Sequence, residues 1–339
     1  MTLLKNFLLL TISTVVALLG AEGAAQLAGY KAFSYAPRSP WQPALLAGDA
    51  ELGWKNKTGR HEHSFLPDNG YPVTTTVSAD GARVSTSVNH RAPTIELYGG
   101  SIGFGWGVTD GTTVGDILSQ KTGTRVVNRA VGGYGGLQVL MRMQRAAGTW
   151  TPSTQPLAIV YLQATHHMNR SSGEPEWLLS NERNNPRGGT MNGIPYARFD
   201  RQNTLVIRTA ERYPAFPLRE SFALVNIAEQ AWVRFDRAIS NAGMLSVQAE
   251  LVRRMAALAD SNGVPFFVIA VYSQPADFTA LRKEVGKSSA NWEFCMHPGF
   301  PAKEFTVPND GHPNAIVHRH YGECVASSLS KTLENRLSD

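Results

Sequence analysis

From residue 95 onward, short apolar runs alternate with longer amphipathic stretches, and this alternation predicts an α/β fold. The apolar runs, which we predict to be strands, begin at residue 95 and then cover 124–128, 157–162 and 264–271. The amphipathic stretches, which we predict to be helices, cover 113–121, 137–147, 221–239, 244–262, 275–285 and 314–333. Such units imply a doubly wound parallel sheet with helices on both faces and a ligand site at the carboxyl ends of its strands.

The chain before residue 93 has a different pattern. Residues 26–92 are polar and β-leaning, so we expect a linker and a small β-rich appendage in front of an α/β domain at 93–339. Within the appendage, 73–88 predicts a β-hairpin that turns at Asp80-Gly81.

One irregular stretch interrupts the α/β domain. Residues 171–217 are polar and punctuated by Gly and Pro, with a candidate hairpin at 196–208. Structureless segments of this length are uncommon inside a compact domain and are usually functional lids or loose insertions. We therefore expect an insertion here.

The N-terminus carries a targeting pattern. Lys5 precedes an apolar run at 7–19, and small residues follow around Glu22. Residues 1–25 are therefore predicted to be a signal peptide or an uncleaved membrane anchor, and either one places the main domain outside the cytoplasm, in the periplasm or beyond the cell. The alternative is a buried helix of a soluble domain.

Composition and charge limit the classes of partner that the chain is expected to bind. The net charge is +5, charges of both signs are scattered, and no dense Lys/Arg run occurs, which argues against nucleic acid. The chain has two cysteines, Cys295 and Cys324, and in an exported protein such a pair predicts one disulfide.

Candidate chemistry lies near both ends of the α/β domain. Ser101 follows the first predicted strand in a glycine-rich turn, and a serine becomes a nucleophile only beside a base. Asp310 and His312, just before the last predicted helix, form an acid–base pair. We therefore expect a nucleophile, a base and an acid at one edge of the sheet.

These motifs resemble the SGNH/GDSL hydrolase family, whose members have a flavodoxin-like sheet. The resemblance covers three blocks, Gly99-Gly100-Ser101 with its Gly-rich continuation at 104–108, Asn128 to Gly133, and Asp310 to Asn314. It implies a serine esterase that acts on an O-acyl ester, such as one on an envelope glycan or lipid, and that needs no cofactor or metal. The opening Glu51-Leu52-Gly53-Trp54 is also similar to that of bacterial envelope members.

The resemblance also implies roles for individual residues. His312 would take the proton of Ser101, and Asp310 would orient the imidazole ring. The remaining candidates, for the oxyanion hole or for substrate binding, are Gly133, Asn128, His166, His167 and Arg170.

The sequence departs from the family at two places. The aspartate that usually precedes the serine is Gly100 here, and the usual asparagine donor of the third block is replaced by His166. A subset of the family has a Tyr…His…Arg pattern that Tyr161, His167 and Arg170 resemble, so either histidine could supply the third oxyanion donor. The family's commoner acid–base spacing is one residue longer, which would put Asn309 in the acid position.

Several functions fit these residues. Water as the acyl acceptor gives an esterase, and a sugar hydroxyl gives an O-acyltransferase. The non-enzymatic alternative is a catalytically degenerate glycan-binding or assembly protein. The departures from the family at Gly100 and His166 favour this alternative. Residues 99–103 also match the Gly-x-Ser-x-Gly elbow of α/β-hydrolases, although that fold keeps its acid and histidine far apart in sequence.

Overall fold

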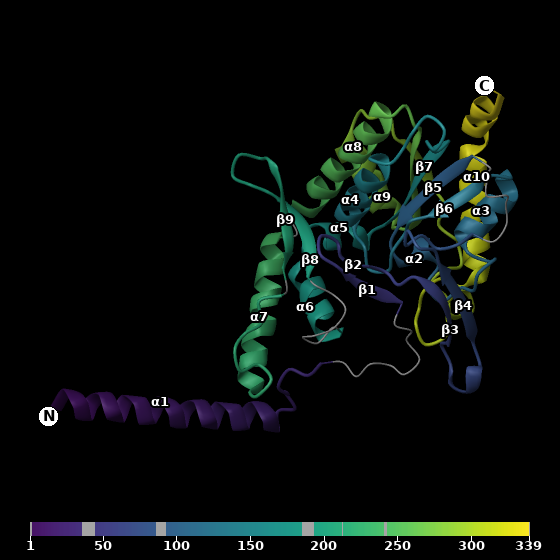
Figure 1. Ribbon diagram of the computed structural model, residues 1–339. Coiled ribbons are helices and arrows are strands. Elements are labelled where there is room, and N and C mark those ends of the chain that lie inside the picture. The colour runs from purple at the N-terminus through teal and green to yellow at the C-terminus, as the bar shows by residue number, and fades with distance from the viewer. Residues whose placement is uncertain are drawn as a thin grey trace.

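The computed structural model describes residues 2–35, 45–85, 93–184, 193–211, 213–240 and 243–338, and its centre is a parallel β-sheet (Figure 1). The five strands of this sheet are β5 (Thr94–Gly99), β6 (Arg125–Asn128), β7 (Ala158–Ala164), β10 (Phe266–Tyr272) and β11 (Asn291–Phe294). All neighbouring pairs are parallel, in the order β11-β10-β7-β5-β6. The predicted α/β fold is therefore confirmed.

The strand order determines where the sheet can hold a ligand. In chain order the strands lie 2-1-3-4-5, which is the flavodoxin-like arrangement. The order reverses between β5 and β7, and ligands of such sheets bind beyond the carboxyl ends of the strands at this switch point. Ser101 follows β5 and His166 follows β7, so both lie at the switch point.

Helices cover both faces of the sheet. One face packs against α4 (Gly136–Ala147), α8 (Met244–Ser261) and α9 (Pro275–Val285), and the other against α3 (Val114–Thr122) and α10 (Ala315–Ser338) (Figure 1). Local caps fix the helix starts: Thr113 and Asp116 form a capping box on α3, and Asn314 Oδ1 accepts the backbone N–H of Ile316 at the start of α10.

The N-terminal appendage consists of two small antiparallel sheets. They pair β1 (Leu46–Asp49) with β2 (Gly53–Asn56), and β3 (Gly59–Ser64) with β4 (Pro72–Val77). The hairpin predicted for 73–88 is wrong in its pairing, because the main partner of β4 is β3. The Asp80-Gly81 turn does form, but beyond it only the bridge between Val77 and Arg83 connects the two arms, and 86–88 lie outside the described residues.

The insertion contains regular structure. The helix α6 (Pro175–Asn184) precedes the antiparallel pair β8 (Ile194–Phe199) and β9 (Leu205–Glu211), which confirms the candidate hairpin. The helix α7 (Ala223–Ser240) follows and packs against α6. The sequence missed α6, the short edge strand β11 and the helix α5 (His166–Ser171), which starts directly after β7.

The N-terminal apolar run is one long helix, α1 (Thr2–Leu27), which projects from the body (Figure 1). By length and composition, Leu3–Leu27 could cross a membrane, and its most apolar window is not buried against the rest of the chain. The helix continues beyond Glu22, where the apolar run was expected to end. The Glu22 carboxylate instead accepts the backbone N–H groups of Ala223 and Leu224 at the start of α7.

The predicted disulfide between Cys295 and Cys324 is present, with Cα atoms 5.8 Å apart. It joins the segment after β11 to α10 and closes a loop with a sequence separation of 29 that contains Asp310 and His312. The cross-link therefore restrains the segment that carries the acid–base pair.

We expect the Cys295→Ala/Cys324→Ala double variant to lose about 3–4 kcal/mol of unfolding free energy, because a cross-link of this span removes chain entropy from the unfolded state. Urea unfolding of the oxidised wild type, the reduced wild type and the double variant measures this loss. The reduced wild type should match the double variant; equal midpoints for all three proteins would contradict a stabilising cross-link.

Candidate active site

The candidate nucleophile lies in a tight turn at the switch point. Ser101 begins the short helix α2 (Ser101–Phe104), directly after β5, and is 6% exposed. The turn is close-packed, because a Cβ on Gly103 would lie only 2.9 Å from the Cβ of Ala130. A glycine at this position therefore allows the serine turn to approach the loop after β6.

The candidate base and acid reach Ser101 from the other end of the domain. His312 Nε2 lies 2.8 Å from Ser101 Oγ, and His312 Nδ1 hydrogen-bonds Asp310 Oδ1. The acid partner of His312 is thus Asp310 rather than Asn309. The three side chains have the relative geometry of a nucleophile, a base and an orienting acid.

The environment of Asp310 favours its ionised form. Burial alone would raise the pKa of this carboxyl, but hydrogen bonds from His312 and Trp106 lower it below its ordinary value. Trp106 Nε1 donates to Asp310 Oδ2 over 3.1 Å, and its ring lies 6.1 Å from that of His312. Asp310 is therefore a fixed carboxylate that can support a positive imidazole.

His167 is held in one tautomer. Its Nδ1 accepts hydrogen bonds from the Tyr161 hydroxyl over 2.8 Å and from the backbone N–H of Ala164 over 3.4 Å. Gln248 donates in turn to the Tyr161 oxygen, so the hydroxyl proton points toward the imidazole. Burial and the charge of Arg170 hold the pKa of His167 well below its ordinary value, so the ring is neutral and its proton is on Nε2.

The Nε2–H of His167 points at the residue before the nucleophile. A Cβ on Gly100 would lie 2.7 Å from His167 Nε2 and 3.3 Å from an Arg170 Nη1 atom. No larger residue fits there without displacing these side chains. The glycine at position 100 therefore leaves room for a donor beside Ser101.

Arg170 is a buried cation next to the same glycine. It donates to the carbonyl oxygen of Tyr134 over 3.2 Å and stacks 4.5 Å from the Trp177 ring. Burial lowers the pKa of Arg170 to about 10, which still leaves it charged at neutral pH. Its Nε is buried without a hydrogen-bond partner among the described residues.

His166 lies beside His167 in a different environment. The two rings are 5.0 Å apart, and His166 Nε2 is buried with no hydrogen-bond partner in the described part of the chain. The pKa of His166 is well below its ordinary value, mainly because the ring is buried and to a smaller extent because Arg170 is positively charged. His166 is neutral like His167, but no hydrogen bond assigns its tautomer.

The side chain of Asn128 holds two loops of the site together and does not offer its amide group to a substrate. Its Nδ2 donates to the carbonyl oxygen of Gly103 over 2.8 Å, and its Oδ1 accepts the backbone N–H of Ala130 over 3.1 Å. The side chain is 2% exposed. It connects the serine turn to the next loop, so the structure places it as a positioning residue.

Gly133 lies in that next loop with φ +85°, and a tryptophan from the appendage supports it. A Cβ on Gly133 would lie 3.1 Å from the indole of Trp54, whose Nε1 donates to Gly132 O over 2.7 Å. The Tyr134 hydroxyl donates back to Trp54 O over 2.6 Å. The Trp54 of the Glu51-Leu52-Gly53-Trp54 opening therefore fixes the Gly133 loop.

A second support from the appendage is Arg83, which the sequence did not single out. Its guanidinium is 1% exposed, pairs with Asp110 at 3.0 Å, and donates to three carbonyl oxygens of the Gly-rich turn after Ser101. Nothing in the sequence around Arg83 indicates that it contacts the serine turn. An arginine that bonds backbone carbonyl oxygens and a carboxylate is nevertheless a common means of fixing a loop.

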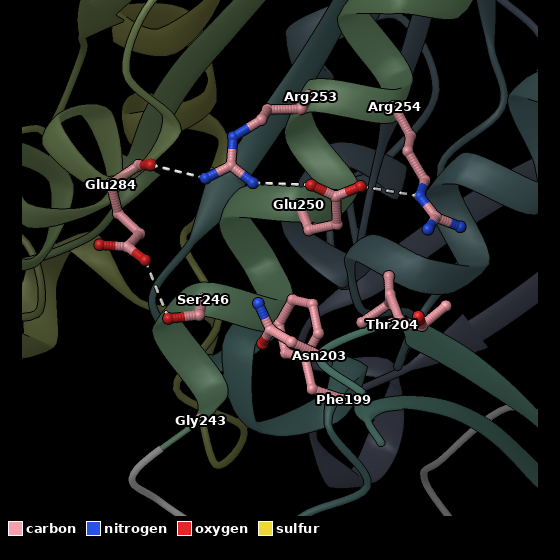
Figure 2. Close-up of a pocket in the computed structure, with 10 residues that line it drawn as sticks. Phe199, Asn203, Thr204, Gly243, Ser246, Glu250, Arg253, Arg254 and Glu284 are labelled. Carbon is pink, nitrogen blue, oxygen red and sulfur yellow. Dashed lines mark hydrogen bonds and ion pairs between the residues drawn. The ribbon is translucent and has the colours of Figure 1, made fainter. Parts of the chain in front are cut away.

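A second hollow, which is lined by residues of α8, α9 and the β8–β9 hairpin, has charged side chains that pair with one another. Its volume is about 650 Å³, and Figure 2 shows Glu250 between Arg253 and Arg254, with Ser246 bonded to Glu284. Because these groups pair with one another, we assign no site to it. Among the described residues, no cluster of three or more His, Cys, Asp or Glu side chains could hold a metal ion.

Comparisons with known proteins return hydrolases among the solved structures. No family model matches the chain, and no curated protein matches it in sequence. The structural matches include a family 2 carbohydrate esterase from Corynascus thermopiles (Myceliophthora fergusii), with 15% identity, a TM-score of 0.36 and coverage of 78% of this chain and 72% of that one. A family two carbohydrate esterase from Cellvibrio japonicus has 11% identity, a TM-score of 0.39 and coverage of 75% and 65%.

A G-D-S-L family protein from Desulfitobacterium hafniense has 10% identity, a TM-score of 0.38 and coverage of 70% and 99%. These likenesses are distant in sequence and in superposition. The functional argument therefore rests on the geometry around Ser101.

Proposed function

We propose that this chain is a serine esterase of the SGNH type that hydrolyses an O-acyl ester. The observation that carries the proposal is the chain of contacts from Ser101 Oγ through the His312 ring to Asp310. Serine, histidine and a carboxylate in this relation form the machinery of nucleophilic acyl transfer on several unrelated folds.

In the first half-reaction Ser101 Oγ bonds to the ester carbonyl carbon while His312 Nε2 takes its proton. The tetrahedral intermediate collapses as the C–O bond to the alcohol breaks, and the imidazolium returns the proton to the leaving alkoxide. Water, deprotonated by His312, then releases the acid from the acyl-enzyme and restores Ser101. Asp310 stays ionised and supports the imidazolium in both halves.

The oxyanion would be held beside Gly100. The His167 Nε2–H points there, and Arg170 adds a buried positive charge. Preorganised donors of this kind stabilise charge as it develops in the transition state. The backbone N–H groups of Ser101 and Gly133 are the expected further donors.

His167→Ala is expected to lower kcat by about 10²–10³-fold, as loss of one oxyanion donor does, whereas His166→Ala should cost less than 10-fold. The reason is that hydrogen bonds fix only His167 with a proton directed at Gly100. Steady-state kinetics on p-nitrophenyl acetate separate the two, with KM nearly unchanged for His167→Ala. A larger loss in His166→Ala would reverse the assignment.

The substrate is proposed to be an acylated envelope glycan or lipid, and this rests on the export of the domain that we propose below from the apolar α1. The test is acetate release from an acetylated oligosaccharide, followed by NMR, with and without a free sugar acceptor. Acetate release alone supports the esterase, and acetylated acceptor would show an O-acyltransferase instead. Neither product with wild-type protein would favour the binding-protein alternative.

Export is proposed from Lys5 and the apolar α1. An alkaline phosphatase reporter fused after Pro43 is expected to be active in bacteria, because this enzyme forms its disulfides only outside the cytoplasm. Deletion of residues 7–19 from the fusion should remove that activity. Activity of the deleted fusion, or inactivity of the intact one at equal protein level, would contradict export.

A further inference from the structure

The helix α7 has apolar residues on two opposite sides. Towards α6 it buries Val233 and the carboxylate of Glu229, which pairs with Arg219 at 3.1 Å. Arg219 in turn contacts Glu182 of α6. This side of α7 is therefore part of the body.

The other side is apolar and uncovered. At 100° per residue, one stripe of α7 consists of Leu224, Ala228, Ala231, Trp232 and Phe235, and this stripe lies on the side of the helix away from Val233. Trp232 is 53% and Phe235 57% exposed, and their rings lie 5.9 Å apart. We call these five residues the outer face of α7. A contiguous exposed apolar face marks an interaction surface.

The membrane-spanning candidate α1 is joined to the start of this helix. Glu22 of α1 accepts the N–H of Ala223 over 2.8 Å and that of Leu224 over 3.0 Å, which satisfies two of the free donors at the N-terminus of α7. Just after α1, the carbonyl oxygen of Lys31 accepts a hydrogen bond from Asn226 over 2.8 Å. The end of α1 is therefore fixed against α7.

The outer face points to the side from which α1 projects. In Figure 1, α1 runs crosswise to α7 and away from the body, while α6 lies on the opposite side of α7. The buried side of α7 faces α6, so the outer face looks along the direction of α1. A bilayer crossed by α1 would have its surface parallel to α7 and next to the outer face.

We propose that α7 lies on the surface of the bilayer that α1 spans, with its outer face in the headgroup region. Because Glu22 is held against α7, the part of α1 that is left to cross the bilayer is residues 3–21, and these 19 residues fall within the range of about 17–25 that crosses the hydrocarbon core. Tryptophan and phenylalanine are favoured at this boundary, and the exposed Arg234 at the edge of the outer face can reach anionic headgroups. Two attachments, α1 and α7, then fix the orientation of the domain above the membrane.

The test uses the full chain with α1, reconstituted in vesicles of phosphatidylethanolamine and phosphatidylglycerol. Both native cysteines are in the disulfide, so a single new cysteine can be labelled with the environment-sensitive fluorophore NBD. The variants are Phe235→Cys and Ala231→Cys on the outer face, with Lys283→Cys on α9, which lies away from α1 (Figure 1), as the matched control. Circular dichroism verifies that each variant is folded.

With nitroxide-labelled lipid, NBD at 231 and 235 is expected to lose at least half of its intensity and to emit at shorter wavelength than NBD at 283, which should be unquenched. Equal emission and no quenching at all three positions, in protein that floats with the vesicles, would overturn the proposal and leave a protein partner as the occupant of the outer face. Protein that does not float with vesicles would overturn it as well. None of these readouts depends on ester hydrolysis.

Discussion

Ser101→Ala is expected to reduce kcat for p-nitrophenyl acetate by about 10⁶-fold, to the floor that remains when a catalytic nucleophile is lost. The proposed acyl-enzyme forms at Ser101 Oγ, which is 2.8 Å from the His312 ring, and no acyl-enzyme can form without that atom. His312→Ala should fall to the same floor, and the double variant no further, because the nucleophile and the base act as a unit. Stopped assays at high enzyme concentration measure these rates.

The Ser101→Ala variant should remain folded, since it removes one small polar atom from a turn that backbone hydrogen bonds and Asn128 hold. Its unfolding midpoint in urea should stay near that of the wild type. Ser153→Ala, in an exposed loop, is the matched control and should retain full activity. Retention of activity by Ser101→Ala would remove the basis of the esterase proposal.

Asp310→Asn is expected to lower kcat by about 10³–10⁴-fold. An amide at this position cannot stabilise the imidazolium, and it can present its NH₂ to His312 Nδ1, which would favour the wrong tautomer. The pKa of Asp310 is held below its ordinary value, so the wild-type carboxylate is charged throughout the neutral range and its loss should affect kcat across that range.

Asn309→Asp is the matched comparison for Asp310→Asn. Asn309 is exposed, with φ +58°, a conformation that aspartate tolerates, and the hydrogen bond to His312 Nδ1 comes from its neighbour. We expect this variant to stay within a few-fold of wild type. A clear gain of activity in Asn309→Asp together with a small loss in Asp310→Asn would show that the longer acid–base spacing of the family applies.

Much of the fold could be predicted because its main elements are long and periodic. Buried parallel strands such as β7 are apolar over most of their length, and α3, α4, α8 and α9 carry a helical pattern of apolar residues. The errors fall where local pattern is weak. The strand β11 was missed because it has only four residues and lies at the sheet edge. The pairing of β4 was wrong because the chain turns back at η1 (Pro67–Asn69) and brings β3 beside β4, and the local sequence pattern does not indicate this turn.

The candidate site could be predicted in part. Ser101, Asp310 and His312 lie in short motifs, so their contact was expected before the structure. Trp54, Arg83 and Trp106 could not be assigned, because each acts on a distant segment, as when Trp106 bonds Asp310 across 204 positions. The choice between His166 and His167 also depended on hydrogen bonds from Tyr161 and Gln248, which only the fold brings together.

The proposal that Ser101 is an activated nucleophile has one direct test, which is covalent labelling with a fluorophosphonate probe followed by mass-spectrometric mapping of the adduct. We expect about one adduct per chain, on the peptide that contains Ser101. Labelling should be absent in Ser101→Ala and strongly slowed in His312→Ala. Folded wild-type protein that takes up no probe, or takes it up at another serine, would contradict the account.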